Sequence, residues 1–364
     1  MTDHNIWDLG IPAVGAKYLD MSIRPVLIKV MSCALLLLSS VSAYAENAPA
    51  KPKELGTFSV KFENDLFSGA DQNYTNGIRL SWLSPEGDTI RPLQYVRDLL
   101  EALAQDNNKS TRFGLSTGQE LYTPKDRYRT DLITDDRPYA GWLYSGLSLH
   151  TVTQRQNERK DLESIELDVG VVGPYALGEQ TQNFVHRIRV IDTFDGWDNQ
   201  LKNEIGLALH YERKWRFFDP VPLGPMQFDA IPHAGVSVGN VITQGNVGGA
   251  VRWGLNLPHN FGPPTLIQGG ASVDRFPEDS ISSYLFAAAD GRYVAHSIFL
   301  DGNTFRNSHS VDKENWVGDL SFGAAILIGR FKLSYANAFR TKEFSGQSRI
   351  SRFGSITASF QAAF

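Results

Sequence analysis

Hydrophobic and polar residues alternate one by one along many short stretches of this chain, which is the side-chain period of a β-strand. Phe58, Val60 and Phe62 share one parity, and the polar residues between them share the other. This pattern predicts strands with one apolar face and one polar face. The same alternation recurs in Ile78–Trp82, Ile165–Val171, Ile205–Tyr211, Trp316–Ile326 and Phe331–Phe339.

About twelve such strands can be placed, an even number, as in the transmembrane barrels of bacteria. We therefore expect an all-β fold, a 12-stranded antiparallel transmembrane β-barrel with a short helix in an extracellular loop. The last strand alternates up to Phe364, which resembles the signal read by the barrel assembly machinery. The expected strands are 56–65, 74–84, 110–121, 139–152, 160–173, 203–216, 226–239, 246–257, 282–300, 313–328, 330–342 and 350–364.

If the first strand starts in the periplasm, the loops after odd-numbered strands face outside. The loop 174–202 contains residues 180–190, which can form a helix. On the other side, residues 92–104 have the apolar spacing of a short plug or surface helix, and the prolines in 258–281 predict an irregular loop. The outward loops are 66–73, 122–138, 174–202, 240–245, 301–312 and 343–349.

The N-terminus has the order of parts found in secretory signal peptides. Basic residues precede an apolar run, Val30 to Leu38, and small residues follow and end in Ala-Tyr-Ala. We expect residues 1–45 to be a signal peptide and residues 46–364 to form the barrel. Residues 1–20 are polar and unlike a signal, which makes Met21 an alternative start. A membrane anchor is the other interpretation, but the run is shorter than the roughly 18 residues of a spanning helix.

Composition narrows the class of protein. The net charge is −5, so no basic surplus points to nucleic acid. The only cysteine, Cys33, lies in the expected signal, which leaves the mature chain without thiol chemistry. A secreted β-sandwich is the soluble alternative, but the apolar faces are too rich in Phe, Trp and Leu for a sheet that meets water. We expect a monomer in the bacterial outer membrane, in contact with its lipid.

Polar residues gather in two outward loops beyond what a passive pore needs. Gln182 and His186 are four residues apart in the expected helix and so share one face. Asn64, Asp65 and Thr75 bound the first loop, and strand parity places Asp65 and Thr75 on the lumen side. Further carboxylates in these loops are Asp71, Asp192, Asp195 and Asp198.

These residue types suffice for metal-assisted hydrolysis of an ester. A neutral imidazole can take a proton from water, and a carboxylate can orient that imidazole. Ca²⁺ held by carboxylate and carbonyl oxygens can neutralise an oxyanion. No serine stands in a G-x-S-x-G elbow, so a covalent serine mechanism has little support. The alternative for His186 is an ordinary loop histidine, and the chain offers other imidazoles that parity places in the wall or lumen, namely His150, His210 and His233.

Three blocks of motif residues follow one another along the mature chain. They are Asn64-Asp65-x-Phe67 with Asp71-x-x-Tyr74-Thr75-x-Gly77; Gln119-Glu120-Leu121-Tyr122-Thr123-Pro124 with Asp136-Arg137-Pro138-Tyr139-Ala140; and Val172-Gly173-Pro174 with Gln182-Asn183-x-x-His186-Arg187-Ile188, Trp197 and Gln200. In the order and approximate spacing of these blocks, the chain resembles the LpxR-type lipid A 3′-O-deacylases. The C-terminal third matches only in strand pattern.

The resemblance implies a twelve-stranded outer-membrane barrel that removes the 3′-acyloxyacyl chain of lipid A with the help of Ca²⁺. By motif, His186 corresponds to the general base that activates water, and Asp65 corresponds to a metal-site carboxylate. Asn64, Thr75 and Gln182 match the polar residues around them. The substrate would be the lipid A part of lipopolysaccharide.

Two parts of the resemblance are looser. Asp192 stands where a member of the family has glutamate, so its shorter side chain changes the reach toward the imidazole. Lys125, Arg127 and Arg129 are candidates for contact with the lipopolysaccharide head, and Arg137 follows them. The other interpretation of these cations is a solvated loop of the kind that meets lipopolysaccharide phosphates in any outer-membrane protein.

Three functions stay open at this point. The barrel could deacylate lipid A, or the same residues could act on glycerophospholipids. It could also be a narrow pore or structural barrel, whose lumen would be packed by polar side chains such as Glu63, Arg79, Glu166 and Asp168.

Overall fold

The computed structural model describes eight stretches of the chain. They are residues 55–64, 73–87, 94–95, 109–126, 128–155, 159–189, 193–262 and 281–362. The expected signal peptide, residues 1–45, lies outside them and stays a prediction. Among the described residues, no helix has the length and apolar character needed to span a membrane.

Twelve long strands of the described chain form one antiparallel sheet, and a short strand, β7 (Val221–Leu223), extends it beside β8. The sequence did not predict β7. The long strands are β1 (Gly56–Asn64), β2 (Asn73–Leu83), β3 (Lys109–Thr123), β4 (Ala140–Gln154), β5 (Lys160–Val172), β6 (Glu204–Arg216), β8 (Met226–Gly239), β9 (Ile242–Leu255), β10 (Ser282–Ser297), β11 (Trp316–Ile328), β12 (Phe331–Arg340) and β13 (Ser351–Ala362).

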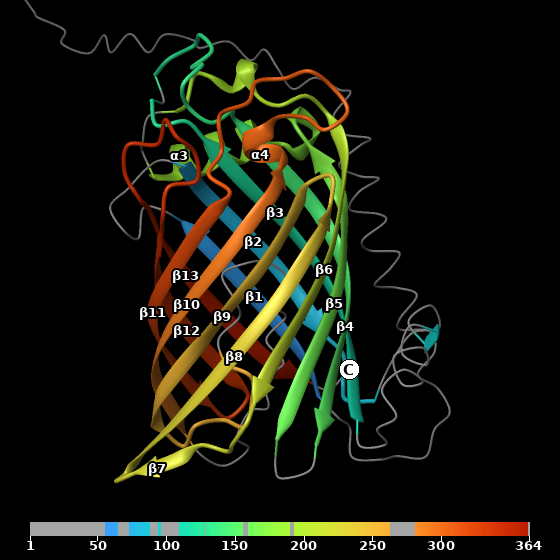
Figure 1. Cartoon of the computed structure of the whole chain (residues 1–364), viewed down its shortest axis with the longest axis vertical. Helices are drawn as coiled ribbons and strands as arrows, with labels where there is room; N and C mark the ends of the chain where they lie inside the picture. The colour runs from blue at the N-terminus through green and yellow to red at the C-terminus, as the bar shows by residue number, and fades with distance from the viewer. Residues whose placement is uncertain are drawn as a thin grey trace, which may run out of the picture. The chain divides into compact units, whose positions relative to one another are not determined.

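The sheet closes on itself, which confirms the predicted 12-stranded barrel (Figure 1). Long strands that follow one another along the chain are paired, including β6 with β8. The ring is closed where β1 pairs with β13, from Gly56 opposite Ala362 to Asn64 opposite Gly354. Closure leaves the twelve strands without an unpaired edge, so their backbone groups are satisfied within the sheet.

Helices α3 (Gly178–Arg189) and α4 (Ile298–Asp301) lie at one end of the barrel, here called the loop end (Figure 1). The 3₁₀ helices η2 (Pro174–Ala176) and η3 (Trp197–Asn199) flank α3 in sequence. The opposite end, where Gly56 pairs with Ala362, is the terminal end. Helix α3 confirms the helix predicted at residues 180–190.

Helix α4 corrects the strand predicted at residues 282–300, which ends at Ser297. Three consecutive apolar residues follow, Ile298, Phe299 and Leu300, and all are buried. A strand would turn the middle one to the opposite face, whereas a helical turn can bury all three. The Asp301 carboxylate accepts a hydrogen bond of 2.8 Å from the Ser297 backbone N–H and so closes this turn.

Two further sequence predictions fall largely outside the described residues. Of the helix predicted at residues 92–104, only residues 94–95 are described, and they are helical. Of the irregular loop predicted at residues 258–281, residues 263–280 are not described, and the described remainder contains no strand.

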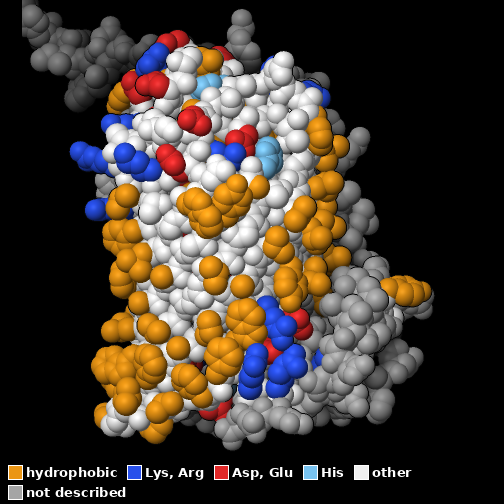
Figure 2. Space-filling view, viewed as in Figure 1, with side chains coloured by type: hydrophobic (Ala, Val, Ile, Leu, Met, Phe, Trp, Pro, Cys, Tyr) orange, Lys and Arg blue, Asp and Glu red, His pale blue; other side chains and the backbone are white. Residues whose placement is uncertain are grey.

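The alternation along each strand sorts side chains between the outer face and the lumen, as predicted. Val60, Leu80 and Leu207 point outward and are 45%, 47% and 47% exposed. Glu166 and Asp168 point inward and are both 3% exposed. Hydrophobic side chains accordingly cover much of the flank seen in Figure 2, as expected where a barrel meets lipid.

The lumen is filled rather than open. Toward the loop end, the Tyr122 ring of β3 stacks on the Phe299 ring of α4 at a centroid distance of 4.1 Å. Strand β3 and the end of β10 belong to opposite walls of the ring, so this stack crosses the lumen. Further polar contacts within the barrel join Arg79 to Glu166 and His233 to Asp290. The histidines predicted to lie in the wall or lumen are buried, namely His150, His210 and His233.

This filling leads to a prediction about conductance. We expect purified protein in planar bilayers to show no stable open-channel steps, because aromatic rings and ion pairs occupy the lumen. Phe299→Ala, which removes one half of the cross-lumen stack, is the variant in which steps should first emerge. Steps of open-porin size from the unmodified protein would instead support the pore hypothesis.

Candidate active site

Helix α3 carries the two residues that the sequence singles out most strongly. Gln182 and His186 lie one turn apart and are buried, at 2% and 3% exposure. Phe184 is 58% exposed, so it lies on a different face of the same helix. The predicted shared face of Gln182 and His186 is therefore the face that packs onto the protein.

An aromatic cluster lies beneath that face of α3. Tyr139, Phe194 and Trp197 pack together with Leu121 of β3. The His186 ring lies 5.5 Å from the Phe194 ring, and the Tyr139 ring lies 5.1 Å from the Trp197 ring, both between centroids. Burial raises the pKa of Tyr139 to about 12, so its hydroxyl stays neutral at physiological pH. The histidine is thus held against apolar rings rather than in water.

A hydrogen bond fixes how the Gln182 amide is turned. The Trp197 indole Nε1–H donates to Gln182 Oε1 at 2.7 Å. Within the described residues, the buried Nε2 of Gln182 has no hydrogen-bond partner. Because an indole can only donate, it selects the amide orientation that leaves the NH₂ group as a donor. A buried hydrogen-bond donor without a protein acceptor is rare in folded proteins. Such a donor is suited to donate a hydrogen bond to an oxygen atom of a ligand.

The first residue of α3 packs closely against the side chains of Trp197 and Leu121. A Cβ added at Gly178 would lie 2.7 Å from the Trp197 ring and 3.0 Å from Leu121. Just before the helix, the side-chain amide of Gln119 donates to the Ala176 carbonyl at 2.6 Å and ties β3 to η2. Gly173 has φ 97°, a backbone conformation that glycine adopts without strain, where the chain leaves β5 for η2.

We expect Gly178→Ala to lower activity by about a hundredfold, since displacements near 1 Å have effects of that size. The added methyl must displace Trp197, and Trp197 holds Gln182. Gly291→Ala is the matched control, because its nearest neighbour would be 4.0 Å away. Both variants should fold as barrels, judged by heat-modifiable migration. Equal turnover rates in the two variants would show that the close packing of Gly178 against Trp197 is not needed for activity.

The first-loop residues are only partly described. Asn64 is buried at the loop end of β1, opposite Asn76 of β2 and Gly354 of β13. Asp65 lies outside the described residues. Thr75 lies in β2, where the pairing with β3 shifts register between Tyr74 and Asn76. The sequence placed the Thr75 side chain on the lumen side by counting alternate residues along the strand. The register shift interrupts that alternation, so the count does not fix the direction of this side chain. The surroundings of the Thr75 side chain are not described.

The predicted substrate-binding cations lie in the loop between β3 and β4. Lys125 and Arg129 are exposed, whereas Arg127 lies outside the described residues. The Arg129 guanidinium is paired with Asp131, including an Nε to Oδ1 hydrogen bond of 3.1 Å. This hydrogen bond and the nearby charge raise the pKa of Arg129 and keep it cationic.

Arg137, which follows these cations in the sequence, is buried and is not exposed with them. It is 1% exposed, and its guanidinium lies 5.0 Å from the Tyr122 ring centroid and 3.5 Å from the Glu343 carboxylate. Burial alone would raise the pKa of Glu343, but the guanidinium groups of Arg137, Arg340 and Arg292 outweigh it and lower that pKa.

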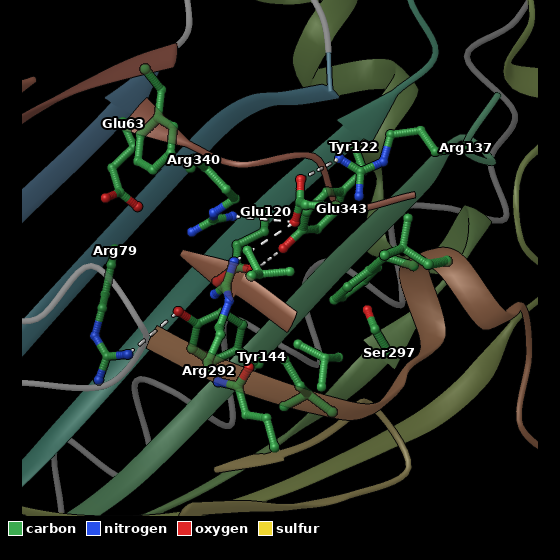
Figure 3. A pocket seen from close by; sticks show the side chains of 18 of the residues that line it. Glu63, Arg79, Glu120, Tyr122, Arg137, Tyr144, Arg292, Ser297, Arg340 and Glu343 are labelled. Carbon is green, nitrogen blue, oxygen red and sulfur yellow. Dashed lines mark hydrogen bonds and ion pairs between the residues drawn. The ribbon is translucent and has the colours of Figure 1, made fainter. Parts of the chain in front are cut away.

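Figure 3 shows Arg137 and Arg340 reaching Glu343 inside the barrel. Arg340 also bonds Asp319 at 2.7 Å, which continues this chain of opposite charges. The cavity beside it has a volume of about 90 Å³, enough for a few water molecules. We interpret this cluster as filling of the lumen and the α3 face as the candidate site.

A metal site is not defined by the residues that the structure describes. Among them, no group of three or more His, Cys, Asp or Glu is arranged to hold a metal ion. Asp65, Asp71 and Asp192 lie outside them, while Asp195 and Asp198 are described and exposed. The expected Ca²⁺ and the orienting role of Asp192 therefore stay predictions from sequence.

The structure adds Trp197 and Gln119 to the residues around the site. Both stand in the sequence blocks described above, but sequence reasoning gave neither a role. The sequence did contain a signal for both residues. Trp197 stands in the same block as Gln182, and Gln119 begins the block Gln119–Pro124, most of which lies in β3. Their contacts around α3 became visible only from the two hydrogen bonds, which join residues 15 and 57 positions apart.

Comparison with known proteins gives one family and one informative fold. The model of the family described as Outer membrane protein LpxR matches residues 30–362. LpxR from Salmonella typhimurium is similar in structure, with 19% identity and a TM-score of 0.67 over 84% of this chain and 99% of that chain. The beta domain of the Bordetella autotransporter Brka has 8% identity and a TM-score of 0.46 over 85% of this chain and 100% of that one, too low to carry an argument. No curated protein matches the sequence.

Proposed function

The chain belongs to the family described as Outer membrane protein LpxR and lies in the bacterial outer membrane, and on this premise we propose that it is a lipid A deacylase. It would hydrolyse the ester-linked 3′-acyloxyacyl chain of lipopolysaccharide at the outer leaflet. The observation that carries the proposal is the buried pair Gln182 and His186 on one face of α3, with the Gln182 donor unpaired among the described residues.

His186 is proposed to act as the general base. Its neutral imidazole takes a proton from a water molecule, and the water oxygen attacks the ester carbonyl carbon. In the second step the tetrahedral intermediate collapses, the ester C–O bond breaks, and the imidazolium returns the proton to the leaving alkoxide. Water and ester thus become a fatty acid and an alcohol, with no covalent enzyme intermediate. Asp192 is proposed to orient the imidazole.

Gln182 is proposed to stabilise the oxyanion that forms in the first step. The Trp197 hydrogen bond holds its Nε2–H group in place before substrate arrives, so no reorientation is needed during the reaction. A fixed donor of this kind contributes about 3–4 kcal/mol to transition-state stabilisation in other hydrolases. Asn64 and Thr75 are proposed to complete the polar surroundings.

Two further groups are proposed from sequence. Ca²⁺, with Asp65 as one ligand, would supply positive charge beside the developing oxyanion. The cations Lys125, Arg127 and Arg129 would meet the phosphates of the lipopolysaccharide head. Arg129 is available there only if a phosphate competes successfully with Asp131.

The test is mass spectrometry of lipid A from cells that express the protein, with and without added Ca²⁺. We expect the loss of one acyloxyacyl chain in the presence of Ca²⁺. Unchanged acylation under both conditions would count against the proposal. Release of fatty acid from glycerophospholipid but not from lipid A, measured in the same membranes, would favour a phospholipase instead.

A further inference from the structure

Three arginines converge on one buried carboxylate at the β5–β6 wall. Asp161 is 0% exposed, and its oxygens accept hydrogen bonds from Arg155 Nε at 2.6 Å, Arg159 Nε at 3.1 Å and Arg213 Nη2 at 2.7 Å. Arg213 also lies 3.9 Å from Glu163. These five residues are called the arginine cluster below.

The arginine cluster faces away from the lumen. Arg213 has the parity of Leu207 and Leu209 in β6, which are 47% and 49% exposed on the outer face. Asp161 and Glu163 likewise share the parity of the outward residues of β5, such as Leu167 and Val169. In Figure 2 a compact group of basic and acidic side chains interrupts the hydrophobic flank where β6 ends in Figure 1.

The cluster lies at the terminal end of the barrel, where β5 begins and β6 ends. Outer-membrane barrels have short turns in the periplasm and long loops outside. Here the β11–β12 connection at the terminal end is Gly329–Arg330, whereas β5 and β6 are joined at the loop end by residues 173–203. The cluster is therefore on the periplasmic side, at the level of the inner leaflet of the outer membrane.

Aromatic rings surround the guanidinium groups. The Arg159 guanidinium lies 4.9 Å from the Phe217 ring centroid, and that of Arg213 lies 5.8 Å from the Trp215 centroid. Phe217 is 48% exposed. Rings of this kind gather where barrels cross from the hydrocarbon region to the headgroups. This places the arginines at headgroup depth, where lipid phosphates lie.

Arg159 offers hydrogen-bond donors that its partner Asp161 does not use. It is one of three guanidinium groups that the cluster sets beside two carboxylates. The side chains of Arg155 and Arg159 are each 37% exposed. Within the described residues, Arg159 uses only its Nε–H for hydrogen bonding, so its two Nη groups still have donors to offer. Asp161 thus holds the three guanidinium groups in position before any ligand binds.

We propose that the arginine cluster binds the phosphate of an anionic phospholipid in the inner leaflet. The guanidinium fork matches phosphate oxygens, and the fixed arrangement reduces the entropy lost on binding. The neighbouring rings and the apolar flank above them would hold the acyl chains. This site is separate from the proposed active site at the loop end and does not depend on its chemistry.

The experiment measures lipid retained by the purified full chain in native mass spectrometry. Protein is mixed with phosphatidylglycerol, phosphatidylcholine or inorganic phosphate at equal concentrations. We expect retention of phosphatidylglycerol over phosphatidylcholine, and about fivefold lower retention in Arg159→Gln, the effect of one basic residue near an anionic surface. Asp161 keeps two arginine partners in this variant, so the barrel should still fold, as heat-modifiable migration would report.

Arg330→Gln is the matched control, because it removes one exposed cation from the same end of the barrel, away from the cluster. Retention that falls equally in both variants would overturn the site in favour of general charge attraction. Equal retention in Arg159→Gln and unmodified protein would also overturn it. Displacement of phosphatidylglycerol by equimolar inorganic phosphate would assign the ligand as a free anion and refute the lipid.

Discussion

Replacing His186 with alanine is expected to abolish deacylation of lipid A while the barrel still assembles. Loss of a general base lowers rates by about 10²–10⁴-fold. The imidazole packs on Phe194 in a loop, outside the strands that pair around the barrel, so the fold does not depend on it. The measurement is the rate of acyl loss from lipid A by mass spectrometry, with heat-modifiable migration as the folding check.

His259→Ala is the matched control for that variant. The His259 side chain is 55% exposed and follows β9 at the terminal end, far along the barrel from α3. We expect it to keep full activity. Turnover in His186→Ala close to that of His259→Ala would show that another group activates the water, and the proposed mechanism would fail with it.

Removal of divalent metal is expected to have an effect of similar size. A chelator selective for Ca²⁺ should stop acyl loss, and added Ca²⁺ should restore it, because the proposed cation would offset the charge that develops on the carbonyl oxygen. Mg²⁺ should restore less, since it demands a tighter octahedral set of ligands. The measurement is again the lipid A acylation pattern, now in isolated membranes with defined free metal.

The predicted Ca²⁺ requirement can also be tested with a variant of the proposed ligand Asp65 and a control variant of another carboxylate. Asp65→Ala should abolish activity at low Ca²⁺ and recover part of it at high Ca²⁺, if Asp65 is a ligand. Asp312→Ala removes another carboxylate from a loop at the same end, an exposed one, and should leave the Ca²⁺ dependence unchanged. Identical Ca²⁺ requirements in both variants would refute Asp65 as a ligand, and full activity without any divalent ion would refute the metal.

Local patterns in the sequence were enough to predict most of the architecture. Each strand has lipid on one side and a packed lumen on the other, so its side chains alternate with a period of two. The alternation of Phe58, Val60 and Phe62 therefore identifies a strand and also shows which of its side chains face the lipid. The pairing of Gln182 and His186 was equally local, because residues four apart share a helix face. For the same reason, the barrel, its strand number and helix α3 agree with expectation.

Contacts between distant segments could be decided only by the tertiary structure. Sequence marked Gln182 as polar, but the orientation of its amide depends on Trp197, which reaches it through the fold of the loop. Arg137 looked like a surface cation until its pairing with Glu343, 206 residues away, was visible. The register shift at Thr75 and the convergence of arginines on Asp161 likewise follow from which strands lie side by side. Periodicity is a property of neighbours along the chain, whereas these contacts depend on strand register and on which segments fill the space inside the ring.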